Sequence, residues 1–169
     1  LERGDVFNAS SRWIERASHK SYPQKMSYAE SLSYIKYPYQ VDPPFFSQDT
    51  IDGLFDSFVV ARKNLWKVQA SFEFFPKITM AFDLGDGRCI AFNWSEIDVF
   101  FIQLEKLNSP YHLFQADLRL YKAALERRMH WDNIITGCHV VERRCPNVYS
   151  PDIPVMLSFF HLPSLKREI

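Results

Sequence analysis

The sequence predicts an α+β fold, an antiparallel β-meander with helices packed on one face of the sheet. Hydrophobic residues make up 47% of the 169 residues and aromatic residues 16%, which is enough apolar material for a core. After residue 55, apolar and polar residues alternate in several short segments, as expected of half-buried strands. One of these segments runs directly into an apolar stripe at helical spacing, so the sequence predicts a helix lying on the sheet.

Residues 1–54 differ in composition from residues 55–169, and we expect them to form separate regions. The first region carries tyrosines among serines and ends near Pro43-Pro44, so it predicts a partly extended arm with a short helix around residues 7–17. Its low aliphatic content disfavours a core of its own. Residues 55–169 are predicted to be the α+β core domain.

The first strands of the core are predicted between residues 56 and 84. FDSFVVARK has the β-branched and aromatic content of a strand, and LWKVQASFEFF alternates apolar with polar residues. After Pro76 the alternation returns in ITMAFDL, which places four apolar residues on one side: Ile78, Met80, Phe82 and Leu84.

A hairpin and a helix are predicted next. Gly85-Asp86-Gly87 indicates a tight turn, because glycine and aspartate tolerate positive φ, and residues 89–92 form the return strand. Asn93 with Glu96 three residues later matches a capping box. The apolar residues that follow have helical spacing and predict a helix to residue 107: Ile97, Phe100, Phe101, Leu104 and Leu107.

The second half repeats strand and helix less clearly. FQADLRLYKAALERRMHW predicts a helix, although Ala116, Leu118 and Leu120 also suit a strand. NIITGCHVVERR and IPVMLSFFHL each predict a strand, and Pro163-Ser164 predicts the start of a further helix. A strand that leads into a helix therefore occurs twice, which leaves open a degenerate duplication of a β-sheet-plus-helix unit.

No pattern of residues predicts catalysis or cofactor binding. Cys138, His139, Cys145 and His161 lack the close ligand pairs of structural zinc sites. The sequence has neither a nucleophile elbow nor a glycine-rich phosphate loop. We therefore expect a protein that is not an enzyme, with no catalytic residues, no metal, no cofactor and no small-molecule substrate.

Charge and cysteine content indicate the compartment. Lys plus Arg and Asp plus Glu both number 20, so the net charge is zero and provides no general attraction to nucleic acids or anionic membranes. Three cysteines, an odd number, fit a reducing compartment. Every apolar run is shorter than the roughly 18 residues that span a bilayer. We expect an intracellular protein, nuclear or cytoplasmic, that has no membrane partner.

Protein recognition is the function that the sequence favours. Aromatic residues are more numerous than a small core requires, and aromatic side chains dominate binding hot spots. Val99 and Ile102 lie beyond the apolar stripe of the predicted helix, and Tyr34, Tyr37 and Tyr39 mark the arm. We predict a scaffold or adaptor module, for example of a nuclear or nucleoprotein complex, that binds another protein chain or a second copy of itself through these five residues. Ile102→Asp is then expected to weaken binding and to leave folding nearly intact.

Single-stranded nucleic-acid binding is the alternative. A four-stranded meander followed by a helix, twice over, resembles the topological outline of the single-strand-binding PC4 and Whirly domains. The resemblance concerns the fold alone and implies single-stranded DNA or RNA as a ligand. Two basic pairs in the second half would then hold phosphates: Arg127 with Arg128, and Arg143 with Arg144.

Overall fold

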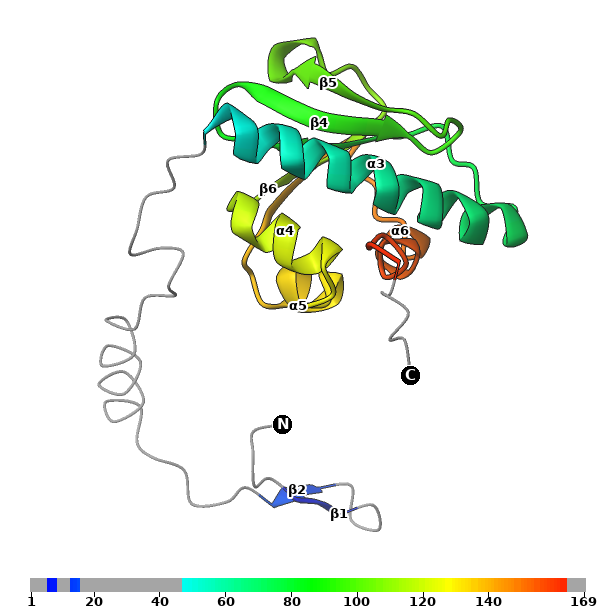
Figure 1. The fold of residues 1–169 in the computed structure, drawn as a ribbon. Coiled ribbons are helices and arrows are strands. Elements are labelled where there is room, and N and C mark those ends of the chain that lie inside the picture. The colour runs from blue at the N-terminus through cyan, green and yellow to red at the C-terminus, as the bar shows by residue number, and fades with distance from the viewer. Residues whose placement is uncertain (1–5, 9–12, 16–46, 164–169) are drawn as a thin grey trace, which may run out of the picture. The chain divides into compact units, whose positions relative to one another are not determined.

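The computed structural model describes residues 6–8, 13–15 and 47–163, and the chain divides into two units, Leu1–Pro43 and Pro44–Ile169. In the first unit β1 (Val6–Asn8) pairs antiparallel with β2 (Trp13–Glu15) (Figure 1). The short helix predicted around residues 7–17 is therefore wrong for the five of these residues that fall in that range. Their β-branched and aromatic residues favour extended backbone over helix.

A five-stranded sheet forms the centre of the second unit (Figure 1). Its order is β5-β4-β3-β6-β7, and only the β3–β6 pair is parallel. The α+β class is confirmed, but the sheet is mixed and is not the antiparallel meander that the sequence predicts. The strands have these bounds: β3 Thr79–Asp83, β4 Arg88–Asn93, β5 Val99–Gln103, β6 Tyr111–Gln115 and β7 Val141–Cys145.

Four helices pack on one face of this sheet (Figure 1). They are α3 (Gln48–Ser71), α4 (Leu118–Leu125), α5 (Trp131–Thr136) and α6 (Asp152–Leu157). The ring of Phe82 in β3 lies at the centre of the core. Each helix contributes one aromatic ring near it, and the ring after α6 belongs to the chain that follows the helix. The centroid distances to Phe82 are 4.9 Å for Phe58 of α3, 5.5 Å for Tyr121 of α4, 5.7 Å for Trp131 of α5 and 5.8 Å for Phe160 after α6. Such edge-to-face and tilted pairs stabilise a core beyond the area they bury.

Helix α3 replaces the two strands predicted between residues 56 and 74. Ser47 caps the helix by accepting a hydrogen bond from the Thr50 amide at 3.3 Å. Its buried apolar residues recur every three or four positions from the first turn: Ile51, Leu54, Phe58, Ala61 and Leu65. The predicted strands are wrong for two reasons. The helical period begins at Ile51, before the predicted domain boundary at residue 55, and the alternation of apolar and polar residues in 66–74 is too short to outweigh it.

The helix predicted from Asn93 to residue 107 is also wrong. Asn93 and Glu96 do interact, but they close a turn: the Glu96 amide donates to the Asn93 carbonyl at 3.2 Å, and the Asn93 side-chain amide donates to the Glu96 carboxylate at 3.1 Å. β5 follows and pairs antiparallel with β4. A continuous β-branched and aromatic run favours a strand when a partner strand is available.

The other face of the sheet is covered by a connection within the chain. β5 and β6 are parallel to each other and lie on opposite sides of the β3–β4 pair, so residues 104–110, which include the short 3-10 helix Leu104–Lys106, cross this face. Beneath the connection is a buried group of small side chains with one leucine, the Ala–Cys cluster: Ala81, Cys89, Ala91 and Leu113. Five half-buried hydrophobic residues pack against it: Phe100, Ile102, Leu104, Leu107 and Tyr111.

The second half departs from its predicted strands. The helix predicted in residues 114–131 is present as α4, but residues 131–136 form α5 and only Val141–Cys145 form a strand. The first half of the strand predicted in residues 153–162 is α6, where Ile153, Met156 and Leu157 are buried at helical spacing, and the second half is neither helix nor strand. The duplication is not confirmed, since two helices separate β6 from β7. The further helix predicted at Ser164 lies outside the described residues.

No helix in the described part of the chain is both long and apolar enough to cross a membrane.

Candidate partner interface

The two predicted partner-binding residues of the described region both lie on β5 but belong to opposite faces of the sheet. Val99 is half-buried on the face that carries the helices. Ile102 lies on the other face, where it packs against the Ala–Cys cluster. The structure therefore does not bring these two side chains onto one surface. Tyr34, Tyr37 and Tyr39 lie outside the described residues.

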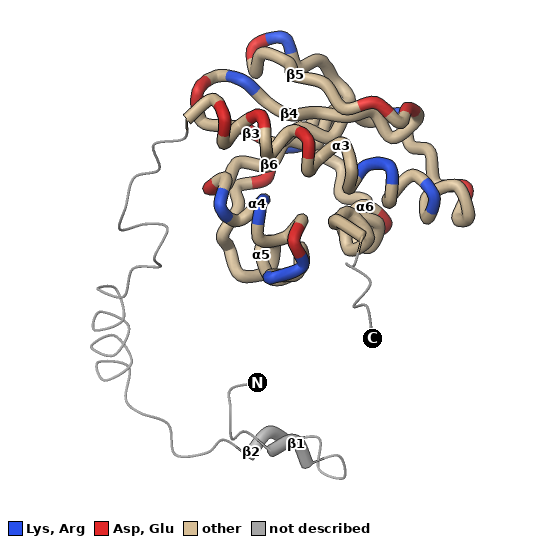
Figure 2. Tube along the Cα trace, viewed as in Figure 1, with Lys and Arg blue, Asp and Glu red and all other residues tan. Residues whose placement is uncertain are grey.

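β5 is an outer strand of the sheet. β4 pairs with one side of it, and among the described residues no strand pairs with its other side. Alternate backbone N–H and C=O groups on that side therefore point away from the sheet. The strand reads VFFIQ, without a charge, a proline or a glycine, and Figure 2 shows it free of charged positions. Charges and prolines are the usual means of preventing an edge from pairing.

Phe101, near the middle of β5, is 40% exposed and is supported from below by α3. The ring of Phe55 stacks on it, with the centroids 4.5 Å apart and the planes 18° from parallel. The guanidinium of Arg88 lies 5.8 Å from the Phe101 centroid and is held by Asp86 at 2.6 Å. An aromatic side chain that is already fixed loses little conformational entropy when it binds.

The apolar surface extends from Phe101 towards the start of the strand. Val99 lies on the same face, and Ile97, in the turn before β5, is 41% exposed. We call Phe55, Ile97, Val99 and Phe101 the β5 surface. It combines unpaired main-chain groups with a fixed aromatic ring, which are the two components of recognition by strand addition.

A fully buried arginine fixes the turn from which β5 begins. Arg62 in α3 donates from Nη2 to the backbone oxygens of Asn93 at 3.1 Å, Trp94 at 3.3 Å and Glu96 at 2.5 Å. Its Nη1 donates to the side-chain oxygen of Gln69 at 2.8 Å, and the amide of Gln69 donates in turn to the Trp94 oxygen. These bonds connect the middle of α3 to the β4–β5 turn.

Burial lowers the pKa of Arg62 to about 10, so it remains charged at neutral pH. Its guanidinium also lies 4.6 Å from the centroid of Phe92, in a cation–π contact. We did not single out Arg62 or Gln69 from the sequence. The signal was present: both occupy positions in the apolar stripe of α3, and a polar residue in such a stripe indicates a buried polar network.

The four arginines predicted to hold nucleic acid do not form one row. Arg143 and Arg144 are neighbours in β7, so their side chains point to opposite faces of the sheet. The guanidinium of Arg144 lies 5.4 Å from the centroid of Tyr149. Arg127 and Arg128 follow α4, and Arg128 forms an ion pair with Glu126 at 2.7 Å.

β7 is attached to β6 by a second polar pair, between buried His112 and half-buried Glu142. His112, which is 4% exposed, contacts Glu142 with 2.9 Å between Nε2 and Oε2, and its ring stacks on Phe114 at 4.7 Å. The hydrogen bond with His112 lowers the pKa of the Glu142 carboxyl group, and the charge of Arg144 adds to this effect. The pair stabilises the strand at this edge.

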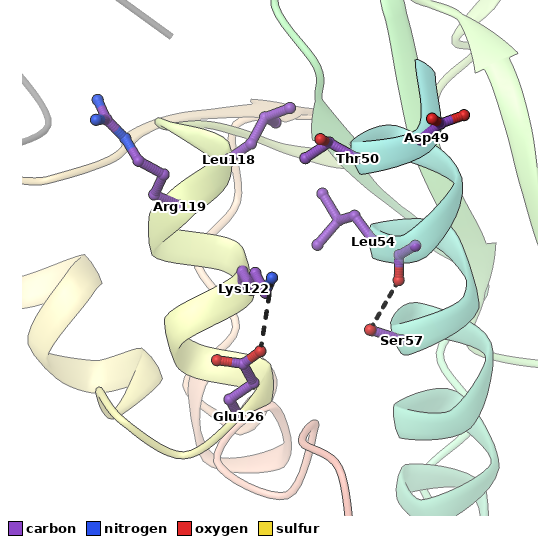
Figure 3. A pocket seen from close by; sticks show the side chains of 9 residues that line it. Asp49, Thr50, Leu54, Ser57, Leu118, Arg119, Lys122 and Glu126 are labelled. Carbon is purple, nitrogen blue, oxygen red and sulfur yellow. Dashed lines mark hydrogen bonds and ion pairs between the residues drawn. The ribbon is translucent and has the colours of Figure 1, made fainter. Parts of the chain in front are cut away.

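A groove of about 440 Å³ separates the first turns of α3 from α4 (Figure 3). Several of its polar side chains are engaged locally: Ser57 donates to the Gly53 carbonyl at 2.9 Å, and Lys122 lies 4.0 Å from Glu126. Leu54 and Leu118 add apolar lining. No group of three or more His, Cys, Asp or Glu side chains in the described ranges could hold a metal ion. The groove therefore offers no convergent set of reactive groups.

No family model, curated protein or solved structure matches this chain.

Proposed function

We propose that this protein is a non-catalytic interaction module whose β5 edge accepts an extended segment of a partner protein as an additional strand. One observation carries the proposal: β5 is an uncharged edge strand with a fixed, 40% exposed Phe101 at its centre. The open main-chain groups of the edge would supply affinity, and the β5 surface would select the side chains of the partner.

The structure also indicates the chemistry of the partner. Alternate residues of an added strand would lie beside Val99 and Phe101, so we expect apolar side chains at every second position of the bound segment. Arg62 and Gln69 fix the turn before β5 without a partner present, which lowers the entropic cost of binding. This partner is either another protein chain or a second copy of this one.

Photo-crosslinking in cells tests the proposal. Phe101 is replaced by benzoylphenylalanine, which keeps the aromatic ring, and the matched control carries the same group at Val141, which is 58% exposed on β7. We expect the group at position 101 to capture one defined protein, and hydrogen exchange of the purified complex to show new protection of the β5 amides. Identical adducts at both positions, or unprotected β5 amides in the complex, would contradict the proposal.

The nucleic-acid alternative has less support from the geometry. Single-strand binders place stacking aromatics inside a positive groove, whereas Arg143 and Arg144 point to opposite faces and the strand that carries Phe101 has no charge. Fluorescence anisotropy with labelled single-stranded DNA and RNA, at low and at physiological salt, separates the two functions. We expect no tight, salt-dependent binding; micromolar binding that weakens steeply with salt would favour the alternative.

A further inference from the structure

A cleft of about 260 Å³ lies where the end of α4, the start of α5 and the chain after α6 meet. It does not involve β5. Its polar lining is made of cationic, imidazole, amide and hydroxyl groups, and none of its lining residues is acidic: Arg127, Arg128, His130, Asn133, Ser158 and His161. Buried Trp131 forms part of the wall and is fixed there by its indole N–H, which donates to the Phe160 carbonyl at 2.7 Å.

Arg127 occupies a backbone position that usually belongs to glycine. Its φ is 59°, in the left-handed region. The Arg127 amide donates to Ala124 at 3.0 Å and the Arg128 amide to Ala123 at 2.8 Å, which is the Schellman pattern at a helix end. A left-handed conformation costs an ordinary L-residue roughly 1 kcal/mol, a cost that glycine avoids. The sequence nevertheless has arginine here, and Arg127 is one of the residues that line the cleft.

Local contacts orient the other polar groups of the cleft. Glu126 holds Arg128 through Nε at 2.7 Å and through Nη2 at 2.7 Å, and the Nη1 group is left for another acceptor. The Nδ1 of His130 accepts a hydrogen bond from the Asp132 amide at 3.3 Å, so a neutral ring carries its proton on Nε2 and can donate. The Nδ1 of His161 donates to the Leu162 carbonyl at 2.8 Å, so a neutral His161 ring presents an acceptor at Nε2.

We propose that this cleft binds a phosphate group, either inorganic phosphate or the terminal group of a small phosphomonoester. Arginine guanidinium groups match the planar, bidentate geometry that phosphate oxygens accept, and the Nε2–H of His130 and the side-chain amide of Asn133 add further donors. A carboxylate in the lining would repel the anion, and no lining residue is acidic; the neighbouring Glu126 carboxylate is paired with Arg128. The site is a short cleft and not a track along the surface, so it suits one phosphate and not a polymer.

Titration of the full-length chain with inorganic phosphate, with O-phosphoserine and with sulfate, followed by calorimetry at constant ionic strength, tests this site. We expect millimolar or tighter binding of phosphate. Stronger binding of O-phosphoserine would identify a phosphomonoester as the ligand, and equal or weaker binding would identify inorganic phosphate. Arg127→Gly is the key variant, because glycine fits the left-handed position: its thermal melt should still show a cooperatively folded protein, while binding falls about tenfold or more.

Two further variants separate the effect of the Arg127 charge from the effect of its left-handed backbone conformation. Arg127→Asn keeps a residue that tolerates this conformation and should also lose binding. Arg143→Ala removes the same charge on exposed β7 and should leave binding unchanged within about twofold. Equal binding by all variants would mean an adventitious ion only and would overturn the proposal. Absence of phosphate binding, or binding of a deoxythymidine oligonucleotide alone, would overturn it too.

Discussion

The two outer strands of the sheet differ in how they are protected. β7 reads VERRC, so three of its five residues are charged, and Pro146 follows it directly. β5 reads VFFIQ and has no such feature. A protein that needed only to avoid edge-to-edge association would protect both edges. The difference favours the proposal that β5 lacks such protection because a partner strand covers this edge in the complex.

The two edges also differ in what attaches them to the core. β7 is held by the part-buried pair of His112 with Glu142, whereas the turn that leads into β5 is held by Arg62. Each attachment can be removed by one substitution. Substitutions at the two attachments, and others on β5 itself, test the comparison between the two edges.

Arg62→Met should have the largest effect. It removes four hydrogen bonds from a charged donor and leaves the oxygens of Asn93, Trp94 and Glu96 without this partner, so we expect a loss of about 3 kcal/mol in the free energy of unfolding. Urea denaturation measures it. Hydrogen exchange should accelerate in β5 and not in β7, whereas Lys63→Met, at the exposed next position, should change neither. Equal acceleration at both edges would show that Arg62 does not act on β5 specifically.

Ile102→Asp is expected to destabilise the fold, in contrast to the sequence-based prediction of nearly intact folding. The side chain is half-buried and packs on the Ala–Cys cluster beneath the 104–110 connection, so a carboxylate there would be partly desolvated and would replace apolar contacts. We expect a loss of about 2 kcal/mol. Val141→Asp, on the same face at the β7 edge but 58% exposed, should cost almost nothing. Similar unfolding midpoints for both variants would place Ile102 on the surface.

Phe101→Lys should give β5 the kind of protection that β7 already has. A charge at the centre of the edge would abolish strand addition, and the loss of the Phe55 stacking contact should cost about 1 kcal/mol of stability. Co-purification with the crosslinked partner and a urea titration measure the two effects. Val141→Lys serves as the control and should leave both unchanged. A Phe101→Lys protein that retains its partner would exclude the β5 edge as the interface.

Glu142→Gln should have the smallest effect, and that effect depends on pH. The pKa of Glu142 in the folded protein is below its ordinary value of 4.5. The charged carboxylate therefore stabilises the fold fully above pH 4.5, and this contribution is lost as the pH falls through the lowered pKa of the folded state. We expect the wild type to lose about 0.5–1 kcal/mol more stability than the variant on acidification below pH 4.5. Parallel pH profiles would show that the pair contributes nothing.

The sequence predicts those parts of the fold whose signals are local. β3, the turn at Gly85 and Gly87, and β4 follow from alternation and from two glycines with φ of 81° and 87°. The parallel pairing of β3 with β6 has no such local signal, because it depends on where residues 104–110 cross the sheet. The sequence does not predict helix α3, because its apolar period begins at Ile51 and crosses the boundary at residue 55 that the change in composition indicates.

The candidate interface could be predicted only in part, for a related reason. The apolar run from Val99 to Ile102 marks a segment with much apolar surface, but its secondary structure decides which side chains share a face. In a helix Val99 and Ile102 are neighbours at i and i+3, whereas in a strand they point to opposite sides. Arg62 and Phe55 lie more than 30 residues from β5 in the sequence, and only the packing of α3 brings them to it.

The Ala–Cys cluster has a consequence for chemical reactivity. Cys89 is fully buried there, and burial raises the pKa of its thiol to about 12, whereas Cys138 is exposed. Since the thiolate is the form that reacts with alkylating reagents, Cys89 should be modified only when the 104–110 connection lifts from the sheet. The protein therefore carries a native chemical probe of its own, and the ratio of the two alkylation rates reports how often the second face of the sheet opens to solvent.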